Sequence, residues 1–83
     1  MAAIHSILIA DDEPSLRHVL TVFLTEHGYE VRAVANGLEA EHELSTRQFD
    51  ILISDVRMPK MEGFALIDRA LALVPDLTIL MMS

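Results

Sequence analysis

Short apolar runs alternate along the chain with stretches in which apolar residues recur at helical intervals. The short runs are typical of strands covered on both faces, and they predict strands over 4–10, 30–35, 49–54 and 77–82. The spaced residues between them predict helices over 14–27, 38–47 and 62–73. This strict alternation favours an α/β fold, in which a parallel sheet is connected by right-handed crossover helices.

The predicted helix ends carry residues suited to those positions. Pro14 suits the first turn of a helix, and Gly28 stands where a C-terminal cap is expected. Asn36 and Gly37 mark a turn before the second helix, whose apolar face is weaker than those of its neighbours. The apolar face of the first helix is made of Leu16, Val19, Leu20, Phe23 and Leu24.

Composition limits the chain to one small globular domain. Hydrophobic residues make up 52% of the 83 residues, more than a disordered segment carries. The net charge of −7 argues against binding to nucleic acid, which needs a basic surface. Cysteine is absent, which excludes thiolate metal sites and fits a cytoplasmic protein. No apolar run approaches the roughly 18 residues of a membrane span, and the N-terminus lacks the features of a signal peptide.

Carboxylates stand at the ends of two predicted strands. Asp11 and Asp12 follow the first strand, and Asp55 follows the third. Ligands of open parallel sheets bind at the carboxyl ends of strands, so these three residues converge if the two strands are neighbours. Three close carboxylates repel unless a cation lies between them, and Mg²⁺ suits an all-oxygen site. The alternative is that each aspartate caps a helix or closes a turn, and spacing alone leaves the two interpretations about equal.

Two motifs carry a resemblance to a known family. "ILIADDEP" together with "FDILISDVRMPKMEGFALI" closely resembles the receiver domain of bacterial two-component response regulators. The Asn36-Gly37 turn and Ala40 match the same family pattern. The resemblance implies a flavodoxin-like (CheY-like) parallel sheet with strand order 2-1-3-4. The "DVRMP" form is most similar to receivers of the nitrogen-regulator type, which precede an ATPase and a DNA-binding domain.

The resemblance also implies a role for each matching residue. Asp55 would accept a phosphoryl group from a sensor histidine kinase and so switch an output domain or effector protein. Asp11, Asp12, Asp55 and the backbone carbonyl of Arg57 would bind Mg²⁺. The hydroxyl of Ser83 would contact the phosphoryl oxygens. The four histidines show no metal-ligand spacing, and Met58 and Met61 are interpreted as packing residues.

The family pattern continues beyond the last residue of this sequence. Receivers have a further helix, strand and helix, and a lysine that pairs with the phosphoryl group; Lys60 lies in the wrong loop to replace it. We therefore expect residues 1–83 to be the N-terminal part of a receiver domain. The fourth strand would then present an unpaired edge, through which the chain would self-associate or be completed by a second chain.

Two other function classes are alternatives to the signalling switch. A phosphatase or mutase of the haloacid-dehalogenase type needs an aspartate two residues after its nucleophile, and that position holds Arg57. The sequence therefore predicts that the chain is not an enzyme. A receiver-fold interaction module that is not phosphorylated, or a domain-swapped fragment, is the alternative function.

Overall fold

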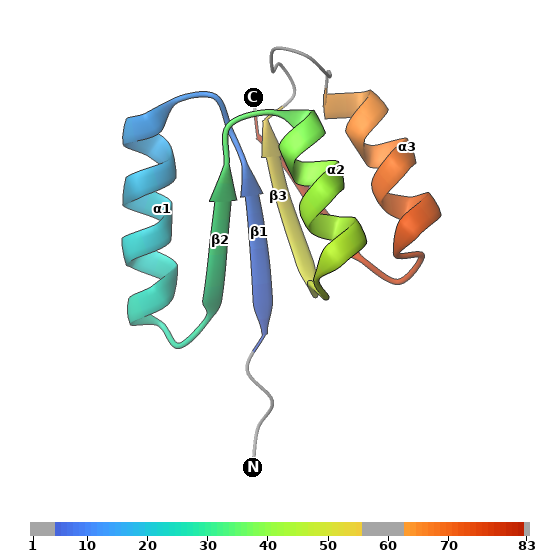
Figure 1. Cartoon of the computed structure of the whole chain (residues 1–83). Coiled ribbons are helices and arrows are strands. Elements are labelled where there is room, and N and C mark those ends of the chain that lie inside the picture. The colour runs from blue at the N-terminus through green and yellow to red at the C-terminus, as the bar shows by residue number, and fades with distance from the viewer. Residues whose placement is uncertain (1–4, 56–62, 83) are drawn as a thin grey trace.

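The structure, a computed structural model, describes residues 5–55 and 63–82, with the side chains of residues 63 and 64 excepted. Strands and helices alternate along the chain, as predicted (Figure 1). The strands are β1 (Ser6–Ala10), β2 (Glu30–Val34), β3 (Ile51–Asp55) and β4 (Thr78–Met82). The helices are α1 (Pro14–Glu26), α2 (Gly37–Thr46) and α3 (Gly63–Leu73). None of the helices in these described ranges is long and apolar enough to cross a membrane.

The four strands form one parallel sheet in the order β2-β1-β3-β4, which confirms the predicted order. The first crossover leads from β1 to β2 at one edge of the sheet. The next two crossovers, to β3 and then to β4, run in the opposite direction across the sheet. With right-handed crossovers, α1 therefore lies on one face of the sheet, and α2 and α3 lie on the opposite face. In Figure 1, α2 and α3 stand side by side, and they contact each other.

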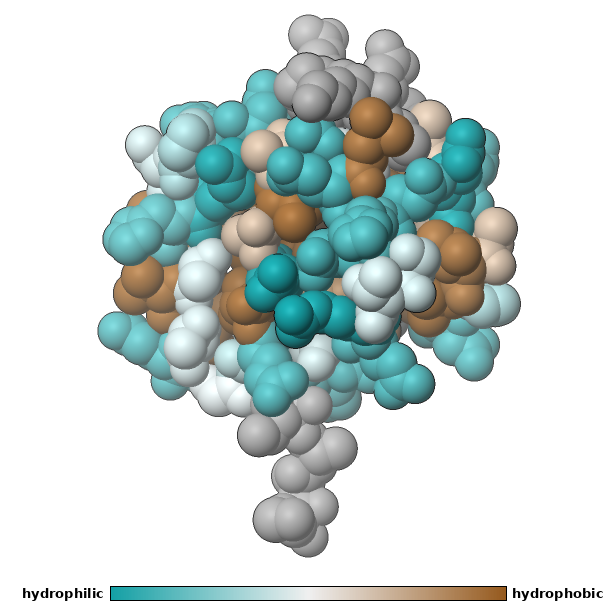
Figure 2. Space-filling view, viewed as in Figure 1, coloured by the Kyte–Doolittle hydropathy of each residue, from teal (hydrophilic) through white to brown (hydrophobic). Residues whose placement is uncertain are grey.

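The core fills the space between the sheet and the α2–α3 layer. Alternate strand residues supply one wall, and the inner faces of the two helices supply the other. The buried members of this cluster are Leu8, Ala10, Val34, Ala40, Leu44, Phe49, Leu52, Leu66, Ala70 and Leu77. In the side of the molecule seen in Figure 2, hydrophilic residues cover much of the surface and hydrophobic ones show in separate small areas.

The α1 side of the sheet is covered less completely. No residue of α1 is buried, and Val19 and Phe23, both assigned to its inner face, are 60% and 55% exposed. Leu80 of β4 is 52% exposed. The helical period of α1 was predicted correctly. Only Leu16, Leu20 and Leu24 of the predicted face are partly buried, because α1 packs mainly on β2.

The C-terminus of α1 and the N-terminus of α2 are both capped by residue types suited to those positions. Gly28 has φ +91°, and its N–H donates to the carbonyl of Thr25 at 3.1 Å, so the predicted C-terminal cap is confirmed. Asn36 is the N-cap of α2, and its side-chain oxygen accepts from the N–H of Glu39 at 2.9 Å. The predicted turn at Asn36 is therefore the start of the helix itself.

The third strand begins and ends later than predicted. Phe49 precedes β3 and is buried in the core, while Asp55 is the last residue of the strand, opposite Met82. Asp50 lies between them and links two strands, because its N–H donates to the Ser6 carbonyl and its carboxylate accepts from the Ser6 N–H, both at 2.8 Å. Because Asp55 pairs with Met82 of β4, the Asp55 backbone is part of the hydrogen-bonded sheet.

Candidate functional site

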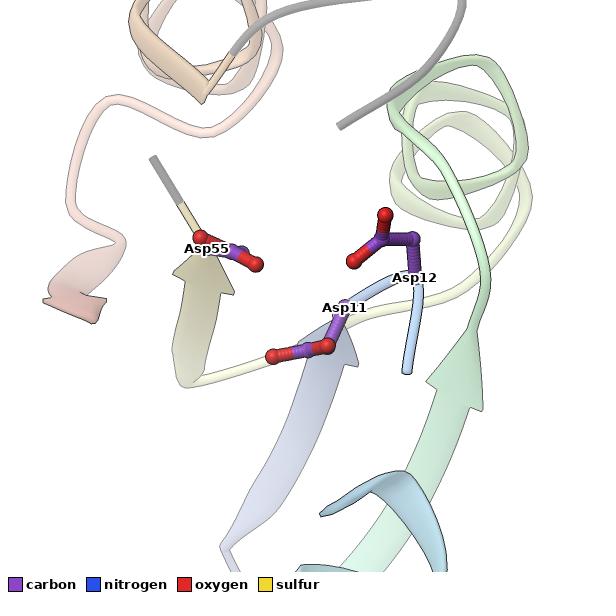
Figure 3. A group of neighbouring side chains, drawn as sticks. All are labelled: Asp11, Asp12 and Asp55. Atoms are coloured by element: carbon purple, nitrogen blue, oxygen red, sulfur yellow. The ribbon is translucent and has the colours of Figure 1, made fainter. Parts of the chain in front are cut away.

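Three aspartates meet at the carboxyl ends of β1 and β3. Asp11 and Asp12 follow β1, and β1 lies beside β3 with Ala10 opposite Ser54. One carboxylate oxygen of each of Asp11, Asp12 and Asp55 lies within 4.8 Å of the others. Figure 3 shows Asp12 and Asp55 turned toward each other from the two strand ends, with Asp11 below them. The structure therefore brings together the three carboxylates singled out in the sequence.

The three carboxylates differ in exposure. Asp11 is buried at 2% exposure, Asp55 is partly buried, and Asp12 is exposed. The cluster is therefore closed on the protein side and open to solvent at Asp12. Oxygen donors in this arrangement fit a hard divalent cation such as Mg²⁺, which keeps several waters while it binds a few carboxylates. A cation would also relieve the repulsion among the three negative charges.

Asp11 is held through its side chain and through both of its backbone polar groups. Its N–H donates to the Val34 carbonyl at 3.1 Å, and its Oδ1 accepts from the Glu13 N–H at 2.8 Å. Its carbonyl accepts from Nη1 of Arg17 at 2.8 Å. The sheet, the loop and the helix thus each fix this residue.

The capping alternative can be compared with the structure. The N-cap of α1 is Glu13, which makes no side-chain capping bond, and not Asp12. Asp11 closes a turn through the Glu13 N–H, so one of its carboxylate oxygens has a structural role. Asp11 therefore closes a turn and also belongs to the carboxylate cluster, whereas the exposed Asp12 is not the N-cap.

Two residues near the cluster were not predicted. Arg17 lies in the first turn of α1 and reaches back to Asp11, a contact between residues six positions apart. Ser54 is fully buried, and its Oγ donates to the carbonyl of Asp55 at 3.0 Å. Neither residue has a sequence signal of its own, because an arginine on a helix and a serine in a strand are both common.

Two predicted site residues cannot be placed. Arg57, with its backbone carbonyl, and Ser83 lie outside the described residues. The described part of the predicted site consists of Asp11, Asp12 and Asp55.

A groove on the surface lies away from the three aspartates. It has a volume of about 610 Å³ and is lined by residues 44–50 and 73–76. These segments lead into β3 and β4, so the groove is at the amino ends of the strands. It contains none of the predicted site residues.

Comparisons with known proteins agree with the fold. A family model described as "Response regulator receiver domain" matches residues 7–83. Sensor protein EvgS of Escherichia coli K12 is 48% identical over 61 residues, which are 74% of this chain and 5% of that protein. The DNA-binding transcriptional regulator NtrC of Azospirillum brasilense is 41% identical over 78 residues, 94% of this chain and 16% of that protein.

A solved structure extends the likeness to three dimensions. Chemotaxis response regulator CheY4 of Vibrio cholerae superposes with a TM-score of 0.89 at 36% identity. The match covers 95% of this chain and 68% of that one. The flavodoxin-like fold with strand order 2-1-3-4 is therefore shared with a solved relative, while the chain spans only a small part of the longer sensor and regulator proteins.

Proposed function

The chain belongs to the response regulator receiver domain family, and on this premise we propose that Asp55 accepts a phosphoryl group from the phosphohistidine of a sensor histidine kinase. In this transfer an oxygen of the Asp55 carboxylate forms the new P–O bond as the P–N bond breaks. The electron pair of the broken bond remains on the imidazole. Phosphorylation then adds negative charge at the end of β3 and switches an output domain or effector protein.

The convergence of Asp11, Asp12 and Asp55 within 4.8 Å carries this proposal. A single aspartate at a strand end has many structural uses, but three on neighbouring strands form a site that suits a divalent cation. Mg²⁺ bound there would neutralise charge on the incoming phosphoryl group. The family resemblance assigns the Arg57 carbonyl as a further ligand and the Ser83 hydroxyl as a contact to the phosphoryl oxygens.

We propose a switch and not an enzyme, located in the bacterial cytoplasm. Any chemistry on a small phosphodonor would be self-phosphorylation and dephosphorylation of Asp55. Direct nucleic-acid binding is disfavoured by the net charge of −7. The relatives include a sensor protein and transcriptional regulators, so the likeness supports the receiver unit and leaves the nitrogen-regulator type as the more specific hypothesis.

The second candidate is an interaction module that is not phosphorylated. One observation favours it: β4 is the last strand of the described sheet, and Leu80 on it is 52% exposed. An exposed apolar residue on an edge strand favours association with another chain.

The test is to incubate the chain with Mg²⁺ and acetyl phosphate and to record the intact mass. We expect one phosphoryl adduct in the wild type and none in Asp55→Asn or in the presence of a chelator, because both the nucleophile and the cation are required. Asp50→Asn, directly before the first residue of β3, is the matched control and should keep the adduct. A wild-type chain that binds Mg²⁺ but forms no adduct would favour the interaction module.

A further inference from the structure

Arg17 connects the first helix to the loop that carries two of the three aspartates. Its backbone N–H donates to the Glu13 carbonyl at 3.1 Å, so it stands in the first turn of α1. Its side chain turns back, and Nη1 donates to the Asp11 carbonyl at 2.8 Å. We propose that Arg17 is a positioning residue for the divalent cation site, which it organises through the Asp11–Asp12 peptide. This inference rests on the proposed function.

The bond to the Asp11 carbonyl sets the direction of Asp12. The carbonyl of Asp11 and the N–H of Asp12 belong to one planar peptide group, so fixing the carbonyl fixes the plane from which Asp12 departs. The side chain of Asp12 is exposed, so its neighbours pack it loosely and its direction depends on this backbone. Arg17 therefore determines whether Asp12 faces Asp55 or turns away into solvent.

The start of α1 is joined to the preceding loop by this contact and not by a side-chain cap. Glu13 occupies the N-cap position, and its side chain makes no capping hydrogen bond. In α2, by contrast, Asn36 caps the first turn directly. The Arg17 side chain donates and therefore does not replace the cap, but its bond to Asp11 ties the first turn of α1 to the loop that precedes the helix.

The partner of Arg17 sets it apart from the other arginines in the described part of the chain. Arg32 and Arg47 pair with Glu43, and Arg69 pairs with Glu41. The guanidinium of Arg17 bonds to a backbone carbonyl beside three carboxylates. Its positive charge opposes cation binding by Coulomb repulsion, while its hydrogen bond favours binding by orienting Asp12. The two effects have opposite signs, so removing the side chain shows which of them dominates.

The experiment measures Mg²⁺ affinity by isothermal titration calorimetry for the wild type, Arg17→Met and Arg17→Lys. Lysine keeps the charge, but its side chain is one bond shorter and cannot place a nitrogen where Nη1 lies. Positioning predicts that both variants bind Mg²⁺ about tenfold more weakly, as expected when a group that orients a metal ligand is lost. Arg69→Met is the matched control, because it also removes one charge and one 2.8 Å hydrogen bond, and it should leave the affinity unchanged.

Thermal unfolding in chelator shows whether each variant is folded. If Arg17→Met does not fold, the Mg²⁺ affinity of Arg17→Lys decides the test. Tighter binding by Arg17→Met together with wild-type affinity for Arg17→Lys would show that Arg17 acts only through its charge, and would overturn the proposal. Equal affinity in all the chains would also overturn it. A wild-type chain that binds no Mg²⁺ would reject the proposed function itself, so the two failures are distinguishable.

Discussion

At the scale of single residues, the site is a compromise between stability and binding. Asp11, Asp12 and Asp55 place three carboxylate oxygens within 4.8 Å of one another. Folding must bring these charges together, whereas the unfolded chain keeps them apart. The metal-free fold therefore carries a repulsion that serves no structural purpose. If a carboxylate serves only to bind a cation, the metal-free protein should be more stable when that carboxylate is removed.

Asp12→Asn tests this expectation, because Asp12 is the most exposed of the three residues. We expect Mg²⁺ affinity to fall by at least about tenfold, since a charged ligand is lost. In chelator, the urea midpoint should rise, since one source of repulsion is removed. A lower midpoint in chelator would mean that the Asp12 carboxylate supports the loop and that the repulsion is of minor importance.

At the scale of the elements, α3 makes the clearest division between inner and outer faces. Leu66 and Ala70 are fully buried against the sheet, while Leu71 and Leu73 are 41% and 45% exposed. The two buried residues are four positions apart, so they lie on the same face of the helix, and Leu71 lies away from that face. Since Leu66 belongs to the main core cluster, the position of α3 on the sheet depends on it.

Leu66→Ala should lower the free energy of unfolding by about 2–5 kcal/mol, because it removes buried apolar surface and leaves a cavity. Leu71→Ala, the same substitution on the same helix, should change it by less than about 0.5 kcal/mol. Urea denaturation followed by circular dichroism measures both variants. Comparable losses in the two variants would contradict this orientation of α3.

The ion pair between α2 and α3 is a second feature at this scale. Arg69 Nη1 lies 2.8 Å from Glu41 Oε2, and the two side chains are 62% and 27% exposed. Glu41 therefore has an ionic partner across the helix pair. Solvent screens such an exposed contact, so its contribution to stability is small beside that of Leu66.

At the scale of the whole molecule, the two faces of the sheet are unequal. The α2–α3 face holds the buried cluster, whereas the other face is covered by α1, which has no buried residue. Val19 and Phe23 of α1 and Leu80 of β4 remain largely exposed. Apolar surface of this kind favours association with a second chain, and the net charge of −7 opposes it when both chains are identical.

We therefore expect self-association through β4 that strengthens with salt. Added salt shortens the screening length and weakens the repulsion between acidic chains, while the apolar contact persists. Sedimentation velocity at low and at high salt measures the effect, and Leu80→Lys should reduce association at both. Leu71→Lys, which places the same charge on an exposed leucine of α3, is the matched control. Equal association in the two variants would exclude β4 as the contact.

The sequence by itself determined the elements and their order. The apolar runs place the four strands, and the helical period places the three helices. A strand buried on both faces is apolar at successive positions, whereas a helix buried on one face is apolar at every third or fourth position. The acidic pair after β1 and the aspartate of β3 were also visible in the chain. Helix caps such as Gly28 were visible because only a few residue types satisfy those backbone positions.

Only the tertiary structure decided which of these residues meet. Whether Asp55 faces Asp11 and Asp12 depends on β1 and β3 being neighbours; the family resemblance implied that order, but no pattern within either strand indicates it. The link from Arg17 to the Asp11 carbonyl and the burial of Ser54 were invisible for the same reason. Patterns along the chain report local periodicity and burial, whereas contacts between distant segments depend on strand order and on the direction of side chains, which are settled when the sheet assembles.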